Sequence, residues 1–297
     1  MATVLDLSGL TEYIQVNRDE LFVKSTMGTK SLDYIDLLPG VKGKEALNYL
    51  DSTVVLQDGK NCGFNPGGSD IFSQRYIEVT PVKIEKEWCH KDFFDTYAAY
   101  QLKWEAGRET LPFEQKIADS NMAVIQDAVE ELIWQGNEDL GINGLIKDLD
   151  EVSASTVTFE SGATVSAKID AIVAALPIAM LKKGVNIYMS YTDFRNYIQE
   201  QNGACCANKP VVDAASESIK YFGDSRITII PLVGLEGTGV IVAATKDALA
   251  YATDIENAHN TYRLWYDETD DVFRFRVLFM AGTAVRFPDE AVIGKEA

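Results

Sequence analysis

Side chains suited to catalysis are scarce in this chain. It contains two histidines, His90 and His259, and four cysteines. Cys89 directly precedes His90, and a thiol beside an imidazole is the pairing that cysteine-dependent enzymes use for nucleophilic attack. Neighbouring residues on a strand point to opposite faces, so this spacing is poor for a thiolate–imidazole pair. A cytosolic cysteine-dependent enzyme is therefore the less favoured interpretation.

The other cysteines, Cys62, Cys205 and Cys206, give no metal or redox motif. No pair in the chain has the C-x-x-C spacing of a zinc site. Cys205 and Cys206 are adjacent in a predicted loop, where a reduced compartment favours inert thiols over a redox pair. The pattern predicts reduced, structural cysteines, with neither a metal nor another cofactor.

Two further segments resemble binding motifs only superficially. The segment from Gly234 to Gly239 is glycine-rich, but no Lys-Ser or Lys-Thr follows it. A phosphate loop opens into a helix, whereas the next segment has the pattern of a strand, so we predict a turn between strands. Asp267, Asp270 and Asp271 lack the central glycine and terminal glutamate of an EF-hand loop. We predict a hairpin turn there, with calcium binding as the minor alternative.

Bulk properties exclude several classes of protein. The 297 residues are 46% hydrophobic, which is enough for a buried core and about two compact units. The longest apolar stretch, Ile169 to Leu181, contains Pro177 and is shorter than the roughly 20 residues that cross a membrane. The first ten residues lack a secretory signal, which predicts synthesis in the cytoplasm. A net charge of -18 argues against a protein that wraps nucleic acid.

The segment from Phe113 to Glu151 concentrates negative charge. It holds ten acidic residues against two basic ones, Lys116 and Lys147, a net charge of -8. One interpretation is a solvated helix face, and the other is the inner wall of a shell that repels packaged DNA. The acidic residues are Glu114, Asp119, Asp127, Glu130, Glu131, Glu138, Asp139, Asp148, Asp150 and Glu151.

The first half of the chain is expected to contain elements that cannot bury themselves. Residues 1–50 have no sustained period, which predicts an extended arm with one short helix at Lys44 to Leu50. Strands are predicted at Ser52 to Gln57 and at Arg75 to Trp88, joined by turn residues. Pro81 favours an edge strand for the second of them. A long two-stranded ribbon is not stable alone, so it must pack on something else.

The rest of the chain alternates helices and strands. Apolar residues recur every three or four positions from Phe113 to Gln135, which predicts a helix roughly 35 Å long. A second helix is predicted at Lys168 to Lys182, and a strand at Val185 to Met189 precedes a helix at Thr192 to Gln201. Further strands are predicted at Ile227 to Leu232, Val240 to Ala244, Tyr262 to Tyr266 and Val272 to Met280, the last two as a hairpin. The predicted fold class is α+β.

Three segments in this order resemble the tailed-bacteriophage major capsid proteins of the Hong Kong 97-like fold. They are AVEELIWQGNEDLGINGLI (Ala128 to Ile146), NIYMSYTDFRNYI (Asn186 to Ile198) and RLWYDETDDVFRFRVLFMAGTAVRFPDEAVI (Arg263 to Ile293). The resemblance extends over essentially the whole chain. It implies an N-terminal arm at 1–50, an E-loop hairpin at 51–96, a peripheral domain with a long spine helix at 97–183 and 259–297, and an inserted axial domain at 184–258.

The resemblance also implies a function and a set of contact residues. The chain would self-assemble into the hexamers and pentamers of an icosahedral head enclosing double-stranded DNA, as a structural protein and not an enzyme. Ribbon charges would set the register between subunits. Asn202 to Lys209 and Gly234 to Gly239 are candidate loops at the capsomer centre. Some members of the family cross-link a ribbon lysine to an asparagine of a neighbouring subunit, and Lys60 is the candidate for that lysine. The candidate intersubunit residues are Lys60, Arg75, Lys83, Glu85, Lys86 and Glu87.

The implied partners are other copies of the chain, a portal protein, a scaffolding protein, decoration proteins and DNA bound without sequence specificity. The chain starts almost directly with arm-like sequence, which leaves a separate scaffolding protein and a trimmed form as alternatives. The implied location is the virion capsid, assembled in the host cytoplasm. An encapsulin-type shell shares the fold and is the alternative function. We also expect residues 1–96 to be mostly intersubunit surface, so that their removal would abolish assembly before folding.

Overall fold

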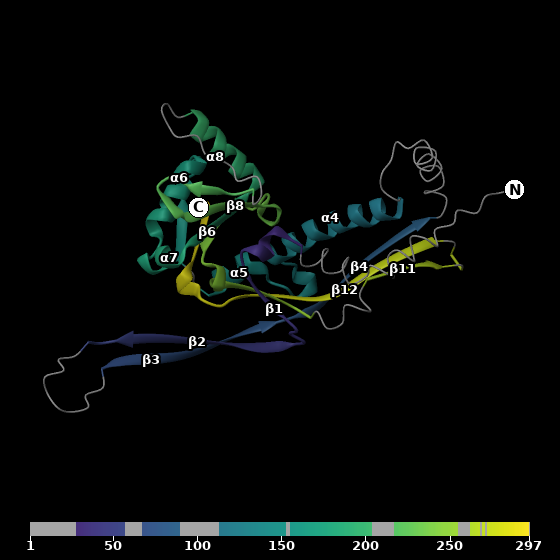
Figure 1. Ribbon diagram of the computed structural model, residues 1–297, viewed down its shortest axis with the longest axis horizontal. Helices are drawn as coiled ribbons and strands as arrows, with labels where there is room; N and C mark the ends of the chain where they lie inside the picture. Colours follow the sequence, from purple (N-terminus) through teal and green to yellow (C-terminus); the bar gives the residue numbers. More distant parts are fainter. Residues whose placement is uncertain are drawn as a thin grey trace.

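The computed structural model describes residues 28–56, 67–89, 113–152, 155–203, 217–254, 262–267, 269–270 and 272–296. They form an elongated molecule of mixed helices and strands (Figure 1). A sheet covered by helices lies at one end, and long strands beneath a single long helix extend to the other. A two-stranded ribbon projects from the strands on the side of the helix-covered sheet.

The helix-covered body is a six-stranded sheet in the order β5-β13-β9-β6-β8-β7. β6 (Val185–Ser190) and β8 (Asp224–Leu232) run parallel at its centre, and helices α6 (Val165–Ala175), α7 (Ile178–Lys183) and α8 (Tyr191–Gly203) pack beside them. The remaining strands are β5 (Ser155–Phe159), β7 (Ile219–Tyr221), β9 (Ile241–Ala244) and β13 (Ala291–Glu296). This sheet therefore draws β5 and β13 from outside residues 184–258.

The second body is built around β12 (Val272–Val285), a strand of 14 residues. Its first part pairs with β11 (Tyr262–Asp267) on one side and β4 (Thr80–Cys89) on the other, and its last part pairs with β10 (Leu249–Thr253). β1 (Asp36–Pro39) adds to β10 in parallel. The β11–β12 hairpin is confirmed, and Pro81 lies on β4, which pairs with no described strand except β12.

Helix α4 (Phe113–Trp134) lies along this second sheet (Figure 1). Ile125, Val129 and Ile133 are buried at spacings of four residues, and they share one core with Phe275 and Phe279 of β12. The helix thus forms because one apolar stripe covers the sheet. The predicted long helix is confirmed over nearly its whole range.

Glycine ends this helix and makes the next turn compact. Gly136 has φ of 73°, in the left-handed region that helices use to stop. A Cβ on Gly136 would lie 2.3 Å from the backbone of Asn143. The chain then passes through η2 (Glu138–Leu140) into the short helix α5 (Gly144–Glu151), which packs on β12. Sequence patterns did not predict α5.

The ribbon consists of β2 (Lys44–Val54) and β3 (Gly68–Glu78), paired antiparallel along their full length of 11 residues each. The short helix predicted at Lys44 to Leu50 is wrong, because this segment is the first half of β2. Leu47 is buried on β2 while Asn48 and Leu50 are exposed, which is the alternation of a strand. β2 also crosses the expected boundary at residue 51.

Two other predicted elements divide in the structure. The stretch Arg75 to Trp88 is the end of β3 followed by β4, and the two strands pair with different partners. The helix predicted at Lys168 to Lys182 is two helices, α6 and α7. Leu176 and Pro177 are extended between them. Proline disfavours helical geometry in the residue before it, which explains the break.

Within residues 1–96, most of the residues that the structure describes are exposed, but several are buried. Leu32 of η1 (Lys30–Asp33), Ile35, Ile77 and Val82 are all buried. Leu32, Ile35 and Val82 lie in the core beneath α4, and Ile77 lies in a smaller core at the base of the ribbon. Removing these residues would remove core packing as well as surface, so the expected loss of assembly before folding stays a prediction.

Candidate assembly surfaces

The ribbon presents apolar side chains to solvent although its two strands pair along their full length. Leu50 and Phe72 lie directly opposite each other on one face, with 51% and 82% of their surface exposed. Tyr76 and Val54 lie on the same face of the strands and are exposed as well. Large apolar side chains gathered on one structured face mark an interaction site in soluble proteins. We refer to this face, which carries residues 46, 48, 50, 52 and 54 of β2 and 70, 72, 74 and 76 of β3, as the ribbon's outer face.

The opposite face of the ribbon holds it against the body. Leu47 and Ile77 are buried in the core at the ribbon base, together with Ala250 of β10. Tyr49 packs edge-on against Phe287, with ring centroids 5.2 Å apart. These contacts fix the direction in which the ribbon projects, so the exposure of Phe72 does not result from a detached loop.

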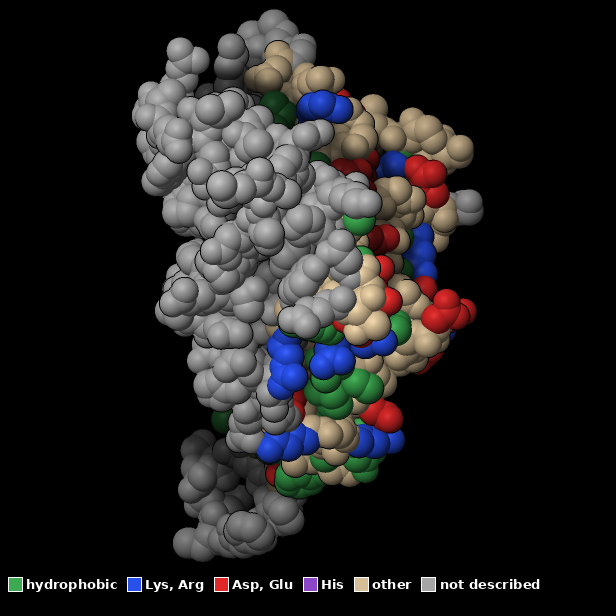
Figure 2. Space-filling view, turned by 90° about the vertical axis from the view of Figure 1, so that its right-hand side faces the viewer, with side chains coloured by type: hydrophobic (Ala, Val, Ile, Leu, Met, Phe, Trp, Pro, Cys, Tyr) green, Lys and Arg blue, Asp and Glu red, His purple; other side chains and the backbone are tan. Residues whose placement is uncertain are grey.

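The sheet formed by β4, β12 and β11 carries charge on the side away from α4. Lys83 pairs with Glu85 at 2.9 Å, and Glu85 lies opposite Arg276 on β12. The Glu87 carboxylate forms an ion pair with the Arg274 guanidinium at 3.1 Å. Figure 2 shows this end of the molecule, where Lys and Arg side chains gather beside hydrophobic ones in the lower part. Charges of both signs alternate here, which suits register-setting contacts between subunits.

Two of the predicted contact residues are used differently. Lys86 points to the α4 side of β4 and donates a hydrogen bond to Asn121 at 2.9 Å, so it holds the helix on the sheet. Arg75 lies on the inner face of the ribbon and lines a cavity at its base. Lys60 lies outside the described residues. Lys83, Glu85 and Glu87 thus remain as the exposed charged group on β4.

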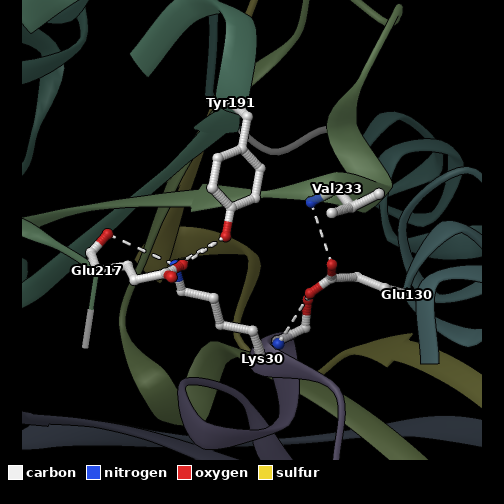
Figure 3. Close-up of polar contacts among 6 residues, drawn as sticks. Lys30, Glu130, Tyr191, Glu217 and Val233 are labelled. Atoms are coloured by element: carbon white, nitrogen blue, oxygen red, sulfur yellow. Dashed lines mark hydrogen bonds and ion pairs between the residues drawn. The ribbon is translucent and has the colours of Figure 1, made fainter. Parts of the chain in front are cut away.

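A buried carboxylate joins the two bodies to the N-terminal segment (Figure 3). Glu130 of α4 is 4% exposed and accepts hydrogen bonds from the backbone N–H and the hydroxyl of Ser31, at 3.1 and 2.8 Å. Its second oxygen accepts from the N–H of Val233 at 3.1 Å, and the Trp134 indole donates to the Ser31 hydroxyl at 2.8 Å. These bonds satisfy a charge that burial alone would disfavour.

A second polar group in Figure 3 adds to this junction from the solvent side. The Lys30 ammonium lies 3.2 Å from Glu217, and the Tyr191 hydroxyl donates to the same Glu217 oxygen at 2.8 Å. Partial burial, followed by the bond to Glu217, raises the pKa of Tyr191. Tyr191 opens α8, so residues 30 and 31 contact α4 and the six-stranded body together. We call Lys30, Ser31, Glu130, Tyr191, Glu217 and Val233 the junction.

Of the two loops predicted at the capsomer centre, the structure describes only residues 202 and 203 of the first, at the end of α8, and all of the second. Thr192, in the first turn of α8, donates through its backbone to Glu236 at 2.9 Å. Asn202 is exposed in the last turn of the same helix, about 15 Å further on. Gly234 is buried in η3 (Val233–Leu235), where a Cβ would lie 2.4 Å from the carbonyl oxygen of Glu130, whereas Gly239 is exposed. Lys209 lies outside the described residues.

The acidic stretch is not one continuous face. Glu130 is buried, Glu138 pairs with Lys147 at 3.0 Å, and Asp150 pairs with Lys295. Asp127 and Glu131 are exposed on α4. Charge counting along the sequence missed this division because the partners come from distant segments. The stretch is therefore not one uniform acidic surface.

A cavity of about 510 Å³ lies at the base of the ribbon, which we call the ribbon-base cavity. Its polar lining includes Arg75 and Glu78 of β3, with Asp148 and Glu151 of α5. Thr283 of β12 donates a hydrogen bond to Asp148 at 2.8 Å. Burial raises the pKa of Asp148 to about 6, although bonds from Thr283 and Asn143 oppose the shift. Sequence reasoning gave no sign of this site.

The residues considered for catalysis or metal binding do not form a site where they are described. Cys89 is exposed at the end of β4, while Cys62, His90, Cys205, Cys206 and His259 lie outside the described residues. Asp267 and Asp270 both contact the Arg274 guanidinium, which makes this turn a charge cluster; Asp271 is not described. The described residues contain no group of three His, Cys, Asp or Glu arranged to hold a metal.

The segment from Gly234 to Gly239 connects strands β8 and β9, as predicted. Among the helices of the described ranges, none is both long and apolar enough to cross a membrane.

Comparison with known proteins places the fold. No protein-family model matches the chain, and a search of curated proteins finds no significant match. Solved structures do match. A chain of the satellite phage P4 procapsid has 10% identity and a TM-score of 0.59, with 97% of this chain and 91% of that one covered. The virus-like particle of Pyrococcus furiosus has 10% identity and a TM-score of 0.54, with coverages of 97% and 98%.

A third match is the capsid of an empty GTA particle, with 11% identity and a TM-score of 0.53. It covers 92% of this chain and 90% of the GTA chain. All three likenesses therefore extend over both bodies and the ribbon, and not over one shared motif. The chain has the fold of a phage major capsid protein.

Proposed function

We propose that this protein is the major capsid protein of a tailed phage, which assembles into hexamers and pentamers of an icosahedral shell around double-stranded DNA. The observation that carries the proposal is the ribbon's outer face. A paired ribbon about 36 Å long extends from the body with Leu50 and Phe72 exposed. Such a ribbon gains free energy when a neighbouring copy covers it.

The geometry of the ribbon favours ring formation. Its outer face does not resemble the charged surface of the β4–β12–β11 sheet, so contact between them would be heterologous. Heterologous contacts repeat from copy to copy and close into rings when the rotation allows it. A closed shell of pentamers and hexamers is built from such rings.

We assign the parts of a Hong Kong 97-like subunit to these elements. The ribbon corresponds to the E-loop, α4 to the spine helix, and the sheet around β12 to the peripheral domain. The axial domain is centred on 184–258, and β5, α6, α7 and β13 add to the same body. The N-terminal arm ends in the segment that enters the junction at Lys30 and Ser31.

The proposal includes partners and a place of assembly. The shell would assemble in the host cytoplasm with a portal protein and a scaffolding protein, and decoration proteins would bind its outside. DNA would be enclosed without specific binding, because exposed acids such as Asp127 and Glu131 repel phosphate. No catalytic step is part of this function, so Cys89→Ser is expected to leave shell formation unchanged.

An encapsulin-type shell is the second candidate. The match to the Pyrococcus furiosus virus-like particle supports it, since that chain is covered over 98% of its length. The two candidates differ in what the shell contains. Particles isolated from producing cells would hold nuclease-protected DNA if this is a phage capsid, and a protein cargo if it is a nanocompartment.

The test of assembly uses the purified full-length chain. Light scattering and electron microscopy, with and without a co-expressed scaffolding protein, should show closed particles of uniform size with rings of five and six subunits. A chain that stays a compact monomer or dimer under every condition would contradict the proposal. A measurable turnover that Cys89→Ser abolishes would support the enzyme instead.

A further inference from the structure

The ribbon-base cavity has an unbalanced charge. Three acidic side chains line it, Glu78, Asp148 and Glu151, against one basic side chain, Arg75. It is open to solvent and its volume of about 510 Å³ exceeds the roughly 30 Å³ that one water occupies in the liquid many times over. A long cationic side chain therefore has room to enter.

Asp148 is the half-buried acid of the cavity, whereas Glu78 and Glu151 are exposed. Its carboxylate is bound by the Thr283 hydroxyl at 2.8 Å and by the Asn143 side chain, and both are neutral donors. No ion pair joins Asp148 to any basic residue that the structure describes, and Lys147 pairs with Glu138 instead. A partly buried carboxylate without a cation is costly, which agrees with its raised pKa.

The cavity lies where the ribbon leaves the body. Arg75, Tyr76 and Glu78 of its wall belong to β3, and Gly282 and Thr283 belong to the part of β12 where the strand changes partners. Tyr76 also lies on the ribbon's outer face. A neighbouring copy that covers this face therefore reaches the mouth of the cavity as well.

We propose that the ribbon-base cavity receives a lysine or arginine side chain from a second copy of this chain during shell assembly, with Asp148 as its main partner. This inference rests on the proposed function, because it needs a neighbouring copy on the ribbon. It adds a charged contact to the apolar one and makes shell formation depend on pH.

The direction of the pH dependence follows from linkage. A cation that docks beside Asp148 lowers the pKa of that carboxyl, so docking releases a proton near pH 6. Assembly should therefore strengthen as the pH rises from 5 to 7.5. The other titratable groups that line the cavity are Arg75, Tyr76 and Glu78 from β3 and Glu151 from α5. Lys147 of α5 acts on Asp148 from outside the lining, and the lining residues of β12 carry no titratable side chain.

The experiment compares Asp148→Asn with Asp139→Asn in the full-length chain. Asp139 is an exposed acid outside the cavity, so its substitution makes the same charge change without the contact. The wild type and Asp139→Asn should need on the order of tenfold less protein to assemble at pH 7.5 than at pH 5. Asp148→Asn should lose this step and assemble more weakly at pH 7.5.

A side-chain-resolution electron microscopy map of the wild-type shell gives a second measurement that needs no variant. A lysine or arginine of a neighbouring copy beside Asp148 is expected. A cavity that holds only water or residues of its own chain overturns the inference, as does an Asp148→Asn profile identical to the wild type. In both cases shells still form, so the proposed function stands. If wild-type shells never form, both are overturned.

Discussion

Ser31 and Glu130 form a paired contact in which the backbone N–H and the hydroxyl of Ser31 both donate to one carboxylate oxygen, at 3.1 and 2.8 Å. The contact lies between the segment that follows residue 28 and the C-terminal part of α4. Through the other oxygen of Glu130 and Val233, it extends to the six-stranded body. One buried acid therefore links the N-terminal segment, the long helix and the six-stranded body, which also share one hydrophobic core.

Replacing Glu130 should destabilise the subunit. Glu130→Gln keeps the size of the side chain but places an amide N–H group against one of the N–H donors. The free energy of unfolding should fall by about 2–3 kcal/mol, since hydrogen bonds to charged groups contribute on that scale. Glu131→Gln, at the exposed next position, should change it by less than about 0.5 kcal/mol. Urea unfolding of the unassembled chain measures both, and equal effects would contradict the role of Glu130.

The ribbon's outer face should control assembly and not folding. Phe72→Asp removes an exposed aromatic side chain, so the free energy of unfolding should stay within about 0.5 kcal/mol of the wild type. Aromatic side chains at interfaces often contribute 2 kcal/mol or more, which predicts a rise of about 30-fold in the protein concentration needed for shells. Phe222→Asp is the control, since Phe222 is 72% exposed on the β7–β8 turn. Shell formation followed by light scattering should distinguish the two.

Close packing at η3 makes Gly234 intolerant of a side chain. Gly234→Ala would place its Cβ 2.4 Å from the Glu130 carbonyl oxygen and 2.7 Å from the Trp134 ring. The resulting shift should cost about 1–3 kcal/mol of stability. Gly43→Ala has open space around the added Cβ and no left-handed φ, so it should be neutral or slightly stabilising. Thermal unfolding measures the stability of both variants. A Gly234→Ala variant as stable as Gly43→Ala, or more stable, would show that the packing at η3 is loose.

Asp148 should lower stability as the pH rises. Its pKa is raised in the folded chain from 3.8 to about 6, so the folded state holds its proton more tightly than the unfolded state. The unassembled subunit should therefore lose stability between about pH 4 and pH 6, by about 1–3 kcal/mol, and remain at the lower level above that range. Asp148→Asn should remove this loss and be the more stable form at pH 7.5. The measurement is urea unfolding of the unassembled chain at a series of pH values. The free energy of unfolding of Asp139→Asn should change with pH as that of the wild type does.

Several elements were predictable because their signals are local. The apolar spacing that defines α4 and the alternation in β11 and β12 are written within single segments. The first half of strand β2 was mistaken for a helix, since a few residues with Leu47 and Leu50 fit either period. Its strand state depends on β3, which pairs with it across a separate part of the chain.

The sequence indicated only that a long ribbon must pack on a partner. It did not indicate which side chains of the ribbon face that partner. A ribbon was predicted from Ser52 to Gln57 and Arg75 to Trp88, whereas the structure forms it from β2 and β3. The charged residues Lys83, Glu85 and Glu87 are exposed on β4, which lies outside the ribbon. Lys86 and Arg75 are half-buried and face other parts of the same chain. The sequence could not show this, because the side of a strand that faces solvent depends on what covers the other side.

The sequence by itself determined the class of fold, the long helix and the scarcity of catalytic groups, because composition and short-range periodicity carry that information. Only the tertiary structure decided which acids are surface charges and which are buried. Glu130 and Glu131 are neighbours of the same type, yet one accepts three hydrogen bonds from residues 99 to 103 positions away and the other faces solvent. Burial and charge pairing are set by segments distant in the chain, and no local pattern encodes them.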